Sequence, residues 1–166
     1  MATYRTSRNI EASIIEYIQS QLTLGGWSNI SVVKSFQRVY EIPLDTFTKS
    51  GALCVRIENT SNLPAEIGDT ATRIQPLVFI DVFAVNDGQR LDLKDFLVSI
   101  LKAGLPYTEY VVNGNTITSR TPNGRIRITK IDDKPVLFTK DKSALAVYDR
   151  YRHLLTLIVS LGRVEA

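Results

Sequence analysis

Residues 77–84 read LVFIDVFA, the most strand-like stretch of the chain. β-Branched and aromatic residues favour strands, and here apolar side chains fall on both faces. Because a strand with two apolar faces needs cover on both, residues 72–85 are expected to form a central strand of a sheet. Pro76 marks its irregular start, and Asp81 is the lone acid in the run. The two faces carry Val78, Ile80, Val82 and Ala84, and Leu77, Phe79, Phe83 and Val85.

The segments before this strand predict further strands joined by polar loops. Residues 52–58 alternate between apolar and polar residues and are typical of a half-buried strand. Residues 59–71 are small and polar, and we expect an exposed hairpin tip or loop there. Residues 31–40 also resemble a strand, and residues 46–51 a loop.

Two amphipathic helices are expected, at residues 7–24 and 92–103. Apolar residues recur at helical spacing in both, and glycine follows each of them. Ser7 is the expected N-cap of the first helix and Asp92 that of the second. Residues 86–88, Asn-Asp-Gly, predict a turn before the second helix.

The last third of the chain predicts short strands separated by turns. Asn113-Gly114 is a strong signal for a tight hairpin turn. Residues 147–161 fit either a strand or a helix, and their β-branched residues favour the strand. The other expected strands are 107–112, 116–120, 125–131 and 136–139, with turns at 123–124 and 132–135.

This order of elements predicts one α+β domain covering residues 1–166. A mainly antiparallel sheet should be flanked by two helices and should carry long polar hairpins and loops. The chain has 166 residues with 44% hydrophobic and 22% charged residues, which is typical of a globular domain. Its formal net charge of +3 does not by itself indicate a nucleic-acid-binding protein.

The composition argues against several functional classes. The single cysteine, Cys54, excludes an internal disulfide, and the single histidine, His153, argues against a zinc site of the usual kind. The sequence shows no signal peptide, no apolar run long enough for a membrane helix, and no phosphate-binding glycine loop. We therefore expect a soluble protein of a reducing compartment, with no catalytic, cofactor-binding or metal-ligating residue.

One enzymatic alternative uses Asp81, Asp92 and Lys94. An acid on a central strand followed by Asp-Leu-Lys resembles the pattern of metal-dependent nucleases, in which carboxylates hold Mg²⁺ and the lysine assists the attacking water. However, that pattern requires the second acid and the lysine on a strand, and here both fall in the expected second helix.

The stretch from Arg120 to Arg152 is basic, with nine Lys or Arg and four Asp. It is compatible with a nucleic-acid groove. A solvated sheet face and an assembly surface are the other interpretations, since the charges alternate with apolar residues.

Several segments resemble a phage tail terminator, or tail-completion (neck), protein. They are Ile80–Ala84 with the turn Asn86–Arg90, the helix start LDLKDFL at 91–97, GLPY at 104–107, DRYRH at 149–153 and LGR at 161–163. The resemblance covers roughly residues 8–163 and consists of an order of elements with scattered residues.

This resemblance implies a structural virion protein, assembled in the host cytoplasm, that forms a ring, usually a hexamer, at the head-proximal end of the tail. The ring would end polymerisation of the tube or sheath protein, join the neck or connector proteins, and let DNA pass transiently through its lumen. Another head–tail connector, neck or tube subunit is the alternative.

Five residues are candidates for the lumen or a subunit boundary of such a ring. Arg120, Arg125 and Arg127 would lie near passing phosphates, and Asn113 and Gly114 would form a hairpin tip that reaches a neighbour. Shortening residues 113–124 to a two-residue turn is expected to leave the subunit folded but to impair ring formation or tail joining.

Overall fold

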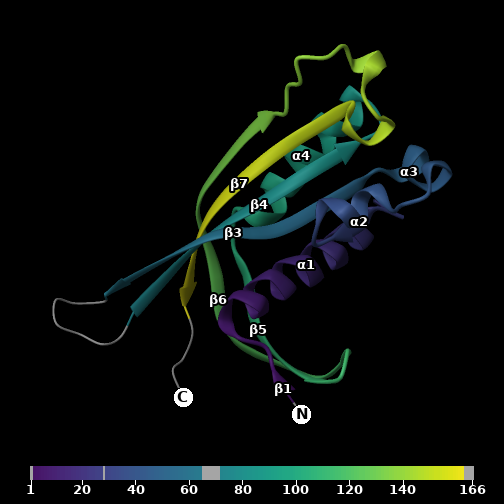
Figure 1. Ribbon diagram of the computed structural model, residues 1–166. Coiled ribbons are helices and arrows are strands. Elements are labelled where there is room, and N and C mark those ends of the chain that lie inside the picture. The colour runs from purple at the N-terminus through teal and green to yellow at the C-terminus, as the bar shows by residue number, and fades with distance from the viewer. Residues whose placement is uncertain (1, 28, 65–71, 163–166) are drawn as a thin grey trace.

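The protein is described by a computed structural model that covers residues 2–27, 29–64 and 72–162 (Figure 1). A curled, mostly antiparallel sheet of seven strands carries helices on both faces. Helices α1 (Thr6–Leu24) and α4 (Asp87–Leu101) cover one face, which we call the helical face. Helices α2 (Phe36–Tyr40) and α3 (Leu44–Ser50) cover one end of the other, the second face. The predicted α+β fold is confirmed.

The strands lie in the spatial order β1-β5-β6-β7-β4-β3-β2. Only the β2–β3 pair is parallel. Strand β7 follows both β4 and β6 in the chain, yet it lies between them. The bounds are β1 (Ala2–Thr3), β2 (Ser31–Val33), β3 (Ala52–Pro64), β4 (Thr72–Ala84), β5 (Leu105–Asn113), β6 (Thr116–Pro135) and β7 (Tyr151–Gly162), with 3₁₀ turns η1 (Lys142–Ala144) and η2 (Val147–Asp149).

Strand β4 is buried on both faces, as its sequence predicts. Val78, Ile80 and Val82 are fully buried in the main core against α1 and α4. On the second face Phe83 packs in a smaller core with Phe47 of α3 and with Cys54 of β3. The strand prediction for 147–161 is confirmed from Tyr151 onward, and the residues before it form η2.

The segment 31–51 was only partly predictable. The strand ends at Val33, and the expected strand 31–40 gives way to α2. The expected loop 46–51 forms α3. Both helices are so short, five and seven residues, that an apolar period cannot show over their length.

Both helix caps were wrongly predicted. Ser7 lies inside α1, which begins after Arg5 without a side-chain cap. Helix α4 begins at Asp87, inside the expected turn 86–88, and Asn86 is its N-cap: the Asn86 Oδ1 accepts a hydrogen bond of 2.7 Å from the Gln89 N–H. Asp92 is an exposed residue in the middle of this helix. Asn is as good an N-cap as Asp, so residue type alone could not decide between Asn86 and Asp92 as the start of the helix.

Strand β6 is one strand of 20 residues, so the predicted turns at 123–124 and 132–135 are wrong. Asn123-Gly124 forms a bulge instead, since the pairing with β5 passes from Pro106↔Arg125 to Thr108↔Pro122. The φ of 95° at Gly124 explains why glycine stands there. The expected strand 136–139 is irregular chain beyond the end of β6.

Within the described parts of the chain, no helix is both long and apolar enough to cross a membrane.

Candidate assembly surface

Strands β3 and β4 continue beyond the sheet as a two-stranded arm. We define the arm as residues 59–64 of β3 and 72–76 of β4. Strand β2 pairs with β3 only at 52–54, and β7 pairs with β4 only at 77–84, so no third described strand pairs with the arm. Figure 1 shows the arm projecting from the body toward the lower left. Part of the polar segment expected to be a loop is therefore strand, and residues 65–71 lie outside the described residues.

An unsupported arm of this kind is a candidate assembly element on physical grounds. Two-stranded ribbons are marginally stable alone in water. Their outer edges carry backbone N–H and C=O groups that a strand from another chain can pair with.

On the opposite side of the sheet, β1 pairs with residues 111–112 of β5, and α1 blocks the part of the β5 edge that β1 leaves open. The Thr108 N–H donates to Ser13 Oγ at 3.0 Å, and the Ser13 hydroxyl donates to the Thr108 carbonyl at 3.3 Å. The Tyr110 N–H donates to Asn9 Oδ1 at 3.2 Å. Two helix side chains thus take the place of a strand, which leaves the arm as the longer open edge.

The β5–β6 hairpin is the second projecting element. Asn113 pairs with Thr116 across a tight turn, and Gly114 has a φ of 62°, as the Asn-Gly signal predicts. Both Asn113 and Gly114 are exposed at the tip. Shortening residues 113–124 to a two-residue turn would remove most of the pairing between β5 and β6, so these residues do not form a replaceable loop.

The structure separates the three candidate arginines. Arg120 lies on the α1 side, where its Nη2 is 3.0 Å and its Nε 3.1 Å from Glu16 Oε1. This contact with Glu16 raises the pKa of the guanidinium. Arg125 and Arg127 lie on the second face, since Ile126 between them is buried in the main core. The three therefore cannot act as one cluster.

A buried ionic cluster on the second face was not predicted. The Asp81 carboxylate accepts from Arg56 Nη2 at 3.1 Å and from Arg152 Nη2 at 3.0 Å. The Asp81 side chain is 2% exposed, and both guanidiniums lie over the ring of Phe36. The lone acid in an apolar strand was the available signal, but its partners come from strands 25 and 71 residues away. Two arginines on one carboxylate make Asp81 a structural counter-charge.

Cys54 lies beside this cluster and is fully buried, although residues 52–58 are typical of a half-buried strand. Burial, and then the charge of Asp81, raise the pKa of the thiol to about 11. Because the thiolate is the reactive form, Cys54 is unsuited to act as a nucleophile at neutral pH.

The nuclease residues do not come together. Asp81 faces the second face, whereas Lys94 lies on α4 over the helical face, 2.7 Å from Asp95 and 3.7 Å from Asp133. Asp92 is exposed on the same helix. In the described chain no group of three or more His, Cys, Asp or Glu side chains is placed to hold a metal ion.

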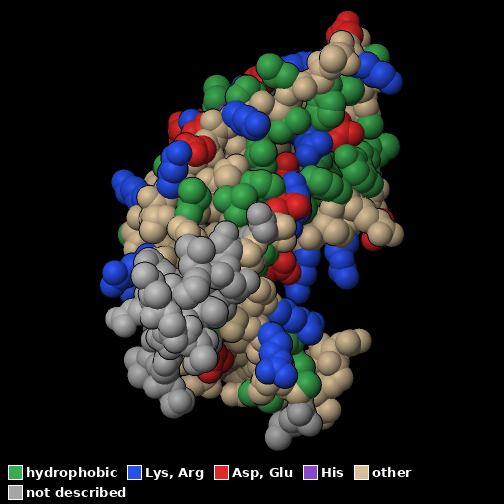
Figure 2. All heavy atoms as spheres, turned by 60° about the vertical axis from the view of Figure 1, so that its left-hand side comes forward, with side chains coloured by type: hydrophobic (Ala, Val, Ile, Leu, Met, Phe, Trp, Pro, Cys, Tyr) green, Lys and Arg blue, Asp and Glu red, His purple; other side chains and the backbone are tan. Residues whose placement is uncertain are grey.

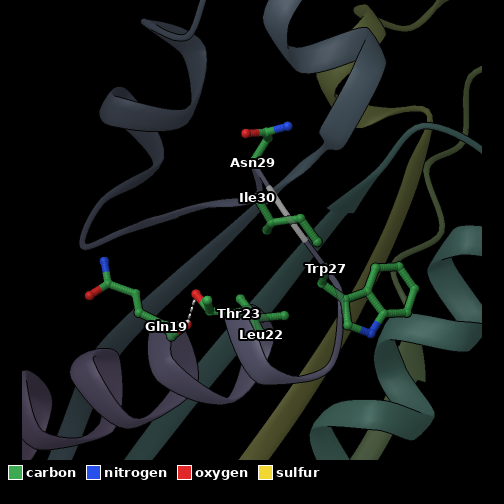
Figure 3. Close-up of a pocket in the computed structure, with 6 residues that line it drawn as sticks. All are labelled: Gln19, Leu22, Thr23, Trp27, Asn29 and Ile30. Carbon is green, nitrogen blue, oxygen red and sulfur yellow. Dashed lines mark hydrogen bonds between the residues drawn. The ribbon is translucent and has the colours of Figure 1, made fainter.

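A shallow pocket lies at the end of α1 (Figure 3). None of its lining side chains is charged, and the Thr23 hydroxyl is already donated to the Gln19 carbonyl at 3.1 Å. Trp27 turns toward α4, where its ring centre lies 6.0 Å from that of Phe96. The pocket therefore shows no chemistry of its own. Its lining residues are Gln19, Leu22, Thr23, Trp27, Asn29 and Ile30.

Comparison with models of protein families finds none that matches this chain, and comparison with curated protein sequences finds no relative.

Proposed function

We propose that this protein is a structural subunit of a tailed phage that forms a ring, hexameric by analogy, at the head-proximal end of the tail. The ring would end polymerisation of the tube or sheath protein and bind the neck or connector proteins. The proposed placement in the virion is based on the sequence resemblance. The observation that carries the assembly role is the arm of β3 and β4, which has no supporting strand within the described subunit.

Closed rings arise from head-to-tail contacts in which one surface of a subunit meets a different surface of the next. The arm supplies the first surface, and the body of a neighbouring subunit supplies the second. Pairing with that neighbour would stabilise the arm, which explains why the chain maintains strand pairing so far from its own core.

The experiment measures mass by native mass spectrometry for the full chain and for an arm-shortened variant. In the variant, Asn-Gly replaces residues 60–76, so that the pair Asn59↔Leu77 closes a two-residue turn. A control variant trims the other hairpin, by two residues only, by replacing residues 113–116 with Asn-Gly between the paired residues Val112 and Ile117. Both variants keep the two cores, and circular dichroism reports their folding.

We expect the full chain and the control to give a species near six times 18.6 kDa, and the arm-shortened variant to remain a folded monomer. An arm-shortened variant that still forms the ring would contradict the role of the arm. A map of the virion that places this chain away from the head–tail junction would contradict the proposed function.

A further inference from the structure

Four cations form a row on the second face of β6, which we call the β6 stripe: Arg125, Arg127, Lys130 and Lys134. All four are exposed. A bulge at Thr129 brings them to one face, because Ile128 pairs with Val159 and Lys130 with Ile158. In a regular strand the two lysines would lie on the other face of the sheet from the two arginines.

The basic stretch 120–152 contains nine Lys or Arg residues, and four of them form the stripe. Its other cations are engaged or lie off the sheet: Arg120 binds Glu16, Lys142 binds Asp87, Arg150 donates to the Leu145 carbonyl, Arg152 binds Asp81, and Lys140 lies in irregular chain. On the stripe, Lys130 is 3.2 Å from Asp132 and Arg125 donates to the Ala103 carbonyl. No ion pair to Arg127 or Lys134 occurs among the residues that the structure describes.

Few acids on this face oppose the stripe. Asp132 is on β6 itself and is the partner of Lys130. Asp81, Glu58 and Asp149 also lie near this face, but each of them is already paired with Arg56 or Arg152. The stripe therefore keeps a surplus of positive charge.

We propose that the β6 stripe binds the phosphate backbone of nucleic acid without sequence preference. A two-residue step along a strand advances about 6.8 Å, close to two phosphate rises of about 3.4 Å. On the neighbouring strand, Ser160 and Thr156 point to the same face and offer hydroxyl donors for phosphate oxygens. Figure 2, in which the left-hand side of Figure 1 comes forward, shows Lys and Arg side chains recurring along the left-hand border.

An acidic protein fits this surface less well. Protein interfaces depend on large apolar anchors at their centre. The large hydrophobic residues that are strongly exposed in the described chain lie outside β6 and β7; they are Leu24, Tyr40, Leu44, Leu91, Leu137 and Phe138. The inference goes beyond ring formation, because the stripe belongs to one subunit and does not require a neighbour.

The experiment measures fluorescence anisotropy of a labelled 30-base-pair DNA duplex titrated with the full chain at several salt concentrations. Four phosphate contacts predict a slope of about −3.6 for log K against log salt, or a loss of about 100-fold between about 50 and 200 mM. Arg125→Gln with Arg127→Gln should reduce this slope by about 1.8. Lys34→Gln with Lys49→Gln removes the same charge at exposed sites outside the stripe and should leave the slope unchanged.

Equal losses in the two double variants would overturn the inference, because net charge alone would then explain binding. Absence of binding at about 50 mM salt, where phosphate contacts are strong, would also overturn it. Displacement of the duplex by polyglutamate as effective as by unlabelled DNA of equal charge would instead assign the stripe to acidic proteins. Mass spectrometry of the same samples reports ring formation separately, so failure here is distinguishable from failure of the proposed function.

Discussion

Asp81→Ala is expected to be severely destabilising, because it leaves the guanidiniums of Arg56 and Arg152 without their shared counter-charge. The Asp81 side chain is 2% exposed, and that of Arg152 is 11% exposed. Removing one partner of a buried ion pair costs about 3–5 kcal/mol of unfolding free energy. At this chain length about 1 kcal/mol corresponds to about 2–4 °C, so the melting temperature should fall by about 6–20 °C.

The assay is urea unfolding followed by circular dichroism, with Asp132→Ala as the control. Asp132 and its partner Lys130 are each 61% exposed, so that change should cost less than about 1 kcal/mol. A loss below about 1 kcal/mol for Asp81→Ala would refute the reasoning.

A triple variant tests whether the stability lost in Asp81→Ala results from the unpaired charges of the two arginines. Arg56→Met, Asp81→Leu and Arg152→Met together remove all three charges and should recover most of the lost stability, since apolar replacements of buried ion clusters are often neutral. Within the described structure the Nε atoms of both arginines are buried without a hydrogen-bond partner, so the apolar replacements also remove two unsatisfied buried donors. A triple variant as unstable as Asp81→Ala would contradict this account.

Three further predictions concern local features. Asn86→Ala should cost about 0.5–2 kcal/mol in urea unfolding and Asp92→Ala less than about 0.5, because only Asn86 caps α4. Gly104→Ala should cost at least about 1 kcal/mol by the same measurement, since φ is +77° and a Cβ would lie 2.6 Å from a carbonyl oxygen. Burial, and then a hydrogen bond to a carboxylate, raise the pKa of Tyr110 to about 12, and burial raises that of Cys54 to about 11. The unfolded chain therefore loses these protons first, so unfolding free energy should fall as pH rises from about 9 to 12; Cys54→Ala should flatten the fall in a pH series of urea titrations.

Sequence periodicity predicted the strands whose side chains alternate into the main core. Burial is continuous over residues 52–55 of β3 and alternates or is continuous over residues 76–84 of β4, so Leu53, Val55 and Val82 carry a clear signal. Signals confined to a few residues were ambiguous. Asn123-Gly124 favours a turn in isolation, and only the pairing with β5 shows that the chain runs on through a bulge.

The candidate site was predictable only in part for the same reason. Which face an arginine occupies depends on every bulge between it and the core, so Arg120 and Arg127 could not be separated by counting residues. The apolar spacing Ile126, Ile128, Ile131 did contain the bulge at Thr129, because a step of three interrupts two-residue alternation. No comparable local signal predicted that the arm would extend past the sheet. The length of the arm depends on where the pairing of β2 and β7 ends.

The position of β7 between β4 and β6 has a consequence during synthesis. Both neighbours precede β7 in the chain, so the ribosome completes them while the place between them is still empty. Until residues 151–162 emerge, a nascent subunit has two open strand edges beside apolar surface, the condition under which chains aggregate. Pairings such as Val78↔Leu157 also join distant parts of the sequence, which slows folding. The yield of the protein in cells should therefore depend on chaperones that shield the chain until its last described strand is inserted.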